Sequence, residues 1–368
     1  MAMELFKNTK VLVCVGSGGV GKTTVAASLA VLAAKEGKNV LVLTIDPAQR
    51  LAQTLGIEGS KDITRVPGQN FAGTLYASVI DHKQTFDQFV SRAAQKSGAT
   101  KSIFENSLYK QLSTNLSGSQ EFTSLEKLYS CYESGDYDLI VLDTPPTKHA
   151  IDFLNAPQKL STLFNEGVAK WFRDPEGKKS GFIGQIIQTS TRQVLKILET
   201  LTGSQFIREL GDFFMNIEQW REKLLQRIVD VHRMLVAPTT KFVLVTSFDR
   251  AKLMEAEYFS REIKKNGHHL DTVIFNRIFP SWLDLRSGSD LKAEGGPNKQ
   301  LIDLYMKMKS FYNQRDVLCQ KFEEKMAKEA RVLRVPDLAK DISDLSGLEE
   351  LSQIVQAANS SQTNLQTK

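Results

Sequence analysis

The sequence contains little cysteine: three residues in 368, namely Cys14, Cys131 and Cys319. They lie far apart and none belongs to a C-x-x-C motif, so the thiolate pairs of a tetrahedral zinc site are missing. A sparse and odd-numbered set also excludes a disulfide framework and is typical of proteins in a reducing compartment.

Long apolar runs and a large excess of one charge are absent as well. No apolar run approaches the roughly 20 residues that a helix needs to span a bilayer, and residues 1–10 are too polar for a signal peptide. The 47 Lys and Arg residues exceed the 42 Asp and Glu residues only slightly, which is no footprint of a nucleic-acid-binding protein. We expect a cytoplasmic protein with no nucleic-acid partner and at most peripheral membrane contact.

What the sequence does contain is a series of short, nearly continuous apolar runs separated by helical segments. The candidate strands are Lys10–Val15, Asn39–Asp46, Thr74–Ile80, Asp138–Asp143, Lys241–Thr246, Thr272–Asn276 and Arg331–Val335. Runs without alternation are typical of parallel strands that are covered on both faces. The repeated strand–helix units therefore predict an α/β fold with a doubly wound, mostly parallel sheet and right-handed crossovers.

Two stretches interrupt this rhythm and are predicted to be helical: residues 83–135 and 150–236. In the second, apolar residues recur at steps of three to four, so its helices either bury each other or offer an apolar groove to a client. A later helix, residues 300–328, is expected to pack on the sheet because its heptad pattern is interrupted. We predict a single domain over residues 1–358 with an inserted helical subdomain, and a disordered tail at residues 359–368.

The chemistry begins where the first strand ends. The segment Gly16-Ser17-Gly18-Gly19-Val20-Gly21-Lys22-Thr23-Thr24 contains the pattern G-x-x-x-x-G-K-[ST] between a strand and a helix. Glycines let successive backbone N–H groups curl around phosphate oxygens, and the following helix directs its positive end there. Lys22 can reach the β- and γ-phosphates, and the Thr23 hydroxyl can bind Mg²⁺. The motif predicts the fold of a P-loop NTPase, with ATP bound by Gly18, Gly19, Val20, Gly21, Lys22, Thr23 and Thr24.

Two acids end strands next to this loop. A carboxylate at Asp46 can orient or deprotonate the attacking water, and Asp143 suits a ligand of Mg²⁺. Either acid alone is more often a helix cap or a turn residue, but together with the loop they form one constellation. The sequence predicts an ATPase with Asp46 and Lys22 in catalytic roles and with Mg²⁺ held by Thr23, Asp46 and Asp143, partly through water.

These motifs resemble those of the ArsA/Get family of deviant-Walker ATPases. The family comprises arsenite-pump ATPases and targeting ATPases for tail-anchored membrane proteins. The resemblance rests on the Gly-Gly-Val-Gly-Lys-Thr-Thr loop, on Asp46-Pro47-Ala48 and on Asp143-Thr144-x-Pro146-Thr147-x-His149. It covers nearly the whole chain. Because the chain has one phosphate loop, the resemblance is to a half-size member of bacterial type.

The resemblance implies further site residues and partners. Asn276 would hydrogen-bond adenine with Arg277 beside it, the loop with Pro336 and Asp337 would pack beside the base, and Asp143 and His149 would belong to a switch. The family also implies a dimer, either a homodimer or a heterodimer with a paralogous ATPase. Its nucleotide state would change the grip of the helical subdomain on a hydrophobic protein client.

One departure from the family concerns Ser17, where the family usually has a lysine that contacts the nucleotide of the opposite subunit. Several readings follow: Ser17 tolerates the turn while another cation compensates, or the active unit is a heterodimer with a paralogue that carries the lysine. In the second case this chain is a weakly active regulatory half. An arsenite-stimulated efflux ATPase is less favoured, because the cysteines do not cluster.

Overall fold

The computed structural model describes residues 3–45, 50–58, 60, 62–94, 119–145, 151, 153–157, 222–223, 225–278 and 299–366. The chain divides into two compact units. The first, here called the sheet unit, consists of Met1–Ile80, Leu128–Ile151 and Met234–Lys368. The second, the helical unit, consists of Asp81–Lys127 and Asp152–Arg233.

The described residues of the sheet unit form an eight-stranded sheet with the order β3-β4-β2-β5-β1-β6-β7-β8. All seven predicted strands are present, as β1 (Val11–Gly16), β2 (Asn39–Thr44), β4 (Thr74–Val79), β5 (Leu139–Asp143), β6 (Thr240–Thr246), β7 (Leu270–Ile278) and β8 (Arg331–Pro336). They pair in parallel. The sequence missed β3 (Thr64–Arg65), which pairs antiparallel with β4, because two residues carry no periodicity.

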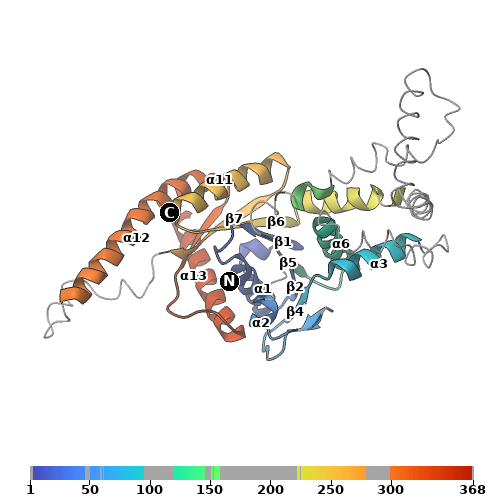
Figure 1. The fold of residues 1–368 in the computed structure, drawn as a ribbon, viewed down its shortest axis with the longest axis horizontal. Coiled ribbons are helices and arrows are strands. Elements are labelled where there is room, and N and C mark those ends of the chain that lie inside the picture. Colours follow the sequence, from blue (N-terminus) through green and yellow to red (C-terminus); the bar gives the residue numbers. More distant parts are fainter. Residues whose placement is uncertain are drawn as a thin grey trace, which may run out of the picture. The chain divides into compact units, whose positions relative to one another are not determined.

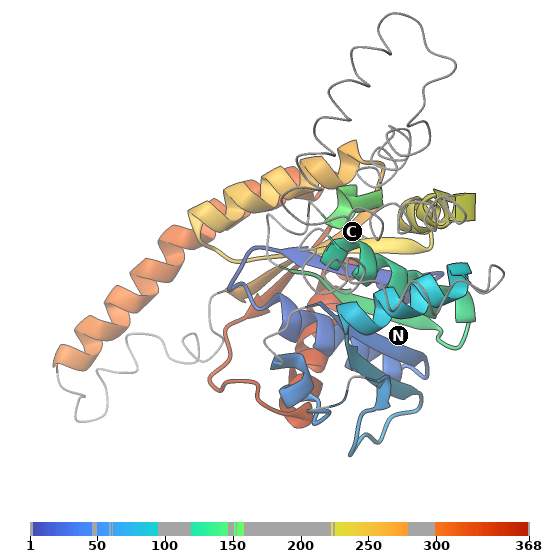
Figure 2. The ribbon, with the colours of Figure 1, turned by 45° about the vertical axis from the view of Figure 1, so that its right-hand side comes forward.

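Helices cover both faces of this sheet, as Figures 1 and 2 show. The crossover from β1 to β2 and the crossover from β6 to β7 run in opposite directions along the sheet, so right-handed connections put their helices on opposite faces. One face carries α1 (Lys22–Lys35) and α13 (Leu345–Gln366), and the other carries α11 (Arg250–Lys265) and α12 (Lys299–Met326). The predicted doubly wound α/β fold is confirmed. The short elements η1 (Glu4–Phe6) and α2 (Arg50–Thr54) precede β1 and follow β2.

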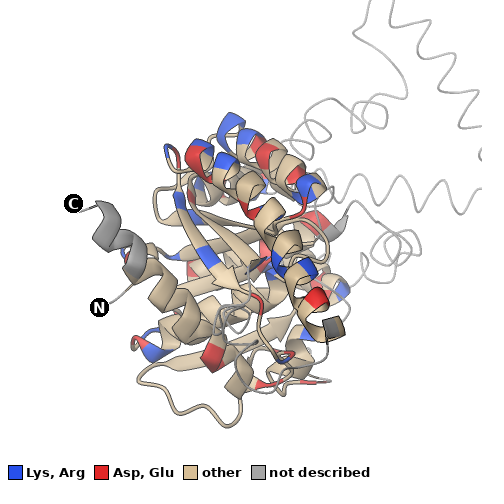
Figure 3. Ribbon diagram, turned by 90° about the vertical axis from the view of Figure 1, so that its left-hand side faces the viewer, with Lys and Arg blue, Asp and Glu red and all other residues tan. Residues whose placement is uncertain are grey.

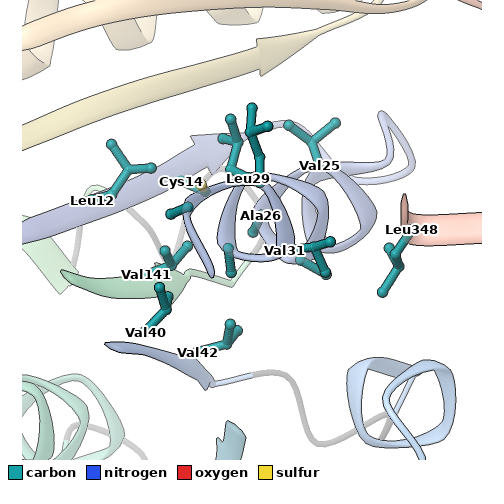
Figure 4. Close-up of a cluster of buried hydrophobic side chains, with 14 of the residues drawn as sticks. Leu12, Cys14, Val25, Ala26, Leu29, Val31, Val40, Val42, Val141 and Leu348 are labelled. Atoms are coloured by element: carbon teal, nitrogen blue, oxygen red, sulfur yellow. The ribbon is translucent and has the colours of Figure 1, made fainter. Parts of the chain in front are cut away.

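The core of the sheet unit lies around α1, which is buried along most of its length. Its small side chains let the helix approach the sheet closely on one side and α13 on the other. Figure 4 shows Leu12, Cys14, Val40, Val42 and Val141 of three adjacent strands gathered near Val25, Ala26 and Leu29 of α1, with Leu348 of α13 close by. This packing fixes the N-terminus of α1 at the end of β1, where the glycine-rich motif lies.

The surface of α11 and α12 carries mixed charges. Figure 3 shows basic and acidic residues mixed along the described helices. Within α11, Arg261 pairs with Glu257 at 3.0 Å, and Lys325 of α12 also pairs with Glu257. Exposed ion pairs of this kind contribute at most about 1 kcal/mol each, so apolar contacts are what hold these helices on the sheet.

Two C-terminal helices differ from their predictions. α13 continues to Gln366 and so includes most of the residues predicted to be a disordered tail, since the run from Asn359 contains no Gly or Pro that would end a helix. In α12, Cys319, Phe322 and Met326 are buried, whereas Leu301 and Leu304 near its N-terminus are more than half exposed. The C-terminal part of the helix therefore packs on the sheet, whereas its N-terminal turns do not bury their leucines.

The described part of the helical unit includes α3 (His82–Ala94), most of α6 (Ser119–Ser134) and helical residues between 225 and 233. The carboxylate of Glu126, which is 1 % exposed, accepts hydrogen bonds from Nε and Nη2 of Arg227 at 2.8 and 2.9 Å. Phe89 and Phe122 pack edge to face. The extent of the predicted helical subdomain stays a prediction, because residues 95–118 and 158–221 lie outside the described residues.

Among the described helices, none combines the length and the apolar character that crossing a bilayer requires.

Candidate functional site

The phosphate loop, residues Gly16 to Thr24, connects β1 to α1. Gly21 has a φ of 82°, in the left-handed region that favours glycine, and a Cβ placed there would lie 2.3 Å from the side-chain nitrogen of Asn276. That nitrogen donates a hydrogen bond to the carbonyl oxygen of Val20 at 2.9 Å. A residue at the end of β7 thus holds the loop in shape, and glycine is required where the two approach.

Three predicted site residues meet at the start of α1. Nζ of Lys22 donates to Oδ1 of Asp143 at 2.8 Å and also to the carbonyl oxygen of Thr144. The hydroxyl groups of Thr23 and Thr44 donate to Oδ2 of Asp143 at 2.7 and 3.2 Å. The Asp143 side chain is fully buried and that of Lys22 is 8 % exposed. The site therefore contains a buried ion pair in which both carboxylate oxygens have partners.

Strand register explains why these groups converge. In the parallel ladders, Asp143 of β5 lies opposite Cys14 of β1 on one side and opposite Thr44 of β2 on the other. Because the carboxyl ends of parallel strands meet at one edge, the last residue of β5 faces the loop that follows β1. Burial raises the pKa of the Cys14 thiol, and the nearby Asp143 carboxylate adds to this shift while Lys22 opposes it. Cys14 is therefore an inert part of the core.

A pocket of about 350 Å³ opens beside the phosphate loop, a volume within the range of small-ligand sites. Its lining consists of Ser17, Gly18, Gly19, Gly21, Lys22, Thr23, Thr24, Ala27, Arg50, Leu51, Thr54, Arg277 and Leu348. Most predicted phosphate-binding residues thus line one pocket, whereas Val20 belongs to the buried core and is not a lining residue.

The sequence prediction missed Arg50 and Leu348 as pocket residues. A signal for Arg50 was present, because it follows β2 at the edge where ligands of parallel sheets bind. No comparable signal exists for Leu348, since only the docking of α13 beside α1 brings it to the pocket.

Ser17 has an unexpected neighbour. Its side chain is 3 % exposed and its hydroxyl donates to the carboxylate of Glu255 on α11. Glu255 also pairs with Lys252 at 3.6 Å. Position 17 therefore holds a neutral hydroxyl bound to an acid.

Residues predicted to surround the base lie at the ends of β7 and β8. Arg277 has a φ of 59° and lines the pocket, next to the buried Asn276. Pro336 lies opposite Ile278, and the Asp337 N–H donates to the carbonyl oxygen of Ile278 at 3.1 Å. The roles predicted for Asn276, Arg277, Pro336 and Asp337 toward adenine stay predictions.

Two predicted switch residues, Asp46 and His149, lie outside the described residues, as do residues 47–49 and 146–148. The catalytic role of Asp46 and its role as a metal ligand therefore stay predictions.

Comparison with known proteins places these features in a family. A sequence profile of the anion-transporting ATPase family (ArsA ATPase) matches residues 9–357. The chain is 27 % identical over 273 residues to the ATPase GET3 of Malassezia globosa. That alignment covers 74 % of this chain and 73 % of that protein. It is 24 % identical over 355 residues to the ATPase GET3 of Kluyveromyces lactis, covering 92 % and 87 %. It is 26 % identical over 301 residues to the ATPase ASNA1 homolog 1 of Paramecium tetraurelia, covering 79 % and 82 %. The chain belongs to the ArsA-type anion-transporting ATPase family and is an ATP-hydrolysing enzyme.

Proposed function

We propose that this chain is a dimeric switch that binds and hydrolyses Mg-ATP and couples its nucleotide state to a client through the helical unit. The observation that carries the proposal is the convergence of Lys22, Thr23 and Asp143 beside the phosphate loop and its pocket. This arrangement supplies an ammonium group, a hydroxyl and a carboxylate where a triphosphate would need them.

The residues fit a magnesium ion by the chemistry of their donor groups. The Thr23 hydroxyl oxygen lies 2.7 Å from a carboxylate oxygen of Asp143, and hard oxygen donors are the ligands that Mg²⁺ prefers. Thr23 would hold the ion directly, Asp143 through water, and Asp46 would complete the set from the end of β2. Such an ion would neutralise charge on the β- and γ-phosphates.

Lys22 would also couple nucleotide binding to the segment that follows β5. Its ammonium group donates to Asp143 and to the carbonyl oxygen of Thr144, and phosphates bound in the loop would draw it away from both. Thr144 begins the segment that leads along the chain to the helical unit, which resumes at Asp152. Nucleotide binding would thus alter the contacts of a segment connected to that unit, which is what a switch requires.

In the hydrolytic step, an oxygen of water forms a bond to the γ-phosphorus while the bond from that phosphorus to the β,γ-bridging oxygen breaks. Asp46 would orient the water or accept its proton. Lys22 and the backbone N–H groups of the loop would stabilise the charge that develops on the phosphate oxygens. The products are ADP and phosphate.

The test compares two hydroxyl groups on α1. Thr23→Ala removes the proposed metal ligand, and we expect Mg-dependent hydrolysis to fall about 100-fold. Ser28→Ala is the matched control, because its hydroxyl donates to the Val25 carbonyl oxygen within the helix, and it should keep the wild-type rate. Equal rates for the two variants, or ATP binding that survives Lys22→Ala, would contradict the proposed site.

The dimer and the client need separate measurements. Mass determination in solution with ADP and with an ATP analogue should give two subunits in the ATP state. An apolar peptide should bind with an affinity that changes between the two nucleotide states. A monomer under both conditions would contradict the dimeric switch.

A second candidate function is a weakly active regulatory half of a heterodimer with a paralogue that carries the missing lysine. The contact of Ser17 with Glu255 favours it, because position 17 holds a neutral hydroxyl that donates to an acid, and Lys252 pairs with that acid instead of lining the pocket. If the chain is such a regulatory half, the purified protein should hydrolyse ATP slowly, and Ser17→Lys should raise the rate of hydrolysis. A fast wild-type rate that Ser17→Lys leaves unchanged removes this candidate.

A further inference from the structure

The pocket beside the phosphate loop is lined by three basic side chains: Lys22, Arg50 and Arg277. In the nucleotide-free protein, Lys22 forms an ion pair with the buried Asp143. The carboxylate of Glu255, which accepts a hydrogen bond from the Ser17 hydroxyl, is paired with Lys252 and, like Lys252, does not line the pocket. The two arginines add positive charge to this lining, and their guanidinium groups can donate hydrogen bonds to the oxygens of a bound triphosphate.

The sheet order separates these arginines. β5 and β2 lie on one side of β1, and β6 and β7 lie on the other. Arg50 is the first residue of α2, which follows β2, whereas Arg277 belongs to β7. Asp143 ends β5, the neighbour of β2. Arg50 thus enters the pocket from the side of the candidate metal ligand, and Arg277 enters it from the opposite side.

An arginine on the Asp143 side of the pocket would contact a different phosphate group from an arginine on the opposite side. Thr23 and Asp143 would hold the metal ion that offsets charge on the terminal phosphates, so their side of the pocket would receive the γ-phosphate. Arg50 is on this side and is exposed, so its guanidinium group is accessible to a ligand. Lys252, the basic residue paired with Glu255, is not a lining residue of the pocket.

We propose that Arg50 binds the γ-phosphate of ATP and supplies, from the same chain, the positive charge that Ser17 does not provide. The proposal rests on the ATP site proposed above. A planar guanidinium group donates two parallel hydrogen bonds to phosphate oxygens and keeps its charge at any physiological pH. In the transition state, negative charge spreads over the equatorial oxygens of the transferred group, and Arg50 stabilises it there without exchanging a proton.

The experiment compares Arg50→Gln and Arg50→Lys with two arginine controls. Arg65→Gln removes the same charge from an exposed residue of β3 that is not a pocket residue. Arg277→Gln removes the other arginine of the pocket. For each variant, kcat is measured together with the dissociation constants of ADP, of a non-hydrolysable ATP analogue, and of ADP with fluoroaluminate, which resembles the phosphoryl group in transfer.

Arg50→Gln should lower kcat about 100-fold and weaken the ATP analogue and the fluoroaluminate complex, with unchanged ADP affinity. Arg50→Lys should recover part of the loss, because a lysine keeps the charge but not the bidentate geometry. Arg65→Gln should behave as the wild type. Arg277→Gln should weaken ATP and ADP by the same factor, because it lies away from the γ-phosphate.

Two results would overturn the role of Arg50 while leaving the ATP site intact: an Arg50→Gln variant with wild-type kcat and fluoroaluminate binding, or one that weakens ATP and ADP equally. Failure of the ATP site itself has a different signature, because the wild-type chain would then bind no Mg-ATP, or Lys22→Ala would bind it normally. The unfolding temperature of Arg50→Gln should equal that of the wild type, since an exposed side chain on a short helix is replaced.

Discussion

The buried ion pair between Lys22 and Asp143 allows a prediction that needs no nucleotide. Lys22→Met leaves the fully buried carboxylate of Asp143 without its cation. Breaking a buried pair by removing one partner costs about 3–5 kcal/mol. Because the hydroxyl groups of Thr23 and Thr44 still donate to Asp143, we expect the lower end, a loss of about 3 kcal/mol in the free energy of unfolding.

The assay is thermal unfolding of the nucleotide-free protein followed by circular dichroism. At about 2–4 °C for each kcal/mol in a domain of this size, Lys22→Met should lower the unfolding temperature by about 6–12 °C. Asp143→Asn should be destabilising as well, since it leaves the nearly buried ammonium group of Lys22 with neutral oxygen acceptors in place of a carboxylate. The double variant should lose less than the sum of the two single losses, because it leaves neither charge buried alone.

A Lys22→Met protein that unfolds within about 2 °C of the wild type would refute this reasoning. So would strict additivity of the two substitutions, because residues in direct contact within one ion pair are expected to be coupled. Either result would mean that the two side chains do not interact in the nucleotide-free protein.

Three further predictions concern other parts of the chain. Gly21→Ala should weaken ATP binding at least about tenfold in calorimetry, because a left-handed backbone costs alanine about 1–2 kcal/mol and its Cβ would collide with Asn276; unchanged affinity would contradict this. Iodoacetamide at pH 8 should label the native protein far more slowly than the denatured protein, because all three thiols are buried and burial raises the pKa of Cys319 to about 11; rapid labelling of Cys319 would contradict it. Arg227→Met should destabilise the helical unit by about 2 kcal/mol, because Glu126 loses two charge-assisted hydrogen bonds while Arg92 stays 3.6 Å away, and hydrogen exchange in α6 should become faster; unchanged exchange there would contradict it.

The parallel strands of the sheet could be predicted from the sequence, because buried parallel strands are encoded by short apolar runs. Each of the seven predicted strands is a mostly apolar run, and each is a strand of the structure. β3 could not be predicted, because its two residues pair through contacts with β4 that no local pattern encodes. In α12 the apolar spacing predicted a packed helix, but periodicity does not reveal how far along the helix its partner extends.

The candidate site was predictable where residues adjacent in sequence carry the chemistry. Lys22 and Thr23 follow from the motif, and Asp143 follows from its place at the end of a strand. The contact of Ser17 with Glu255 depends on the packing of α11 against the sheet, and no local sequence pattern around either residue predicts it. The hydrogen bond from Asn276 to Val20 likewise requires the folded sheet.

We infer that a triphosphate binds in the phosphate loop and draws the Lys22 ammonium group away from Asp143 and from the Thr144 carbonyl oxygen. A crystal structure with magnesium and a non-hydrolysable ATP analogue tests it most directly. We predict the β- and γ-phosphates within hydrogen-bond distance of the Lys22 ammonium group, with the contact from Lys22 to the Thr144 carbonyl oxygen broken. Phosphates bound away from residues 18–24, or a Lys22 that still contacts Asp143 and Thr144 beside a bound nucleotide, would contradict it.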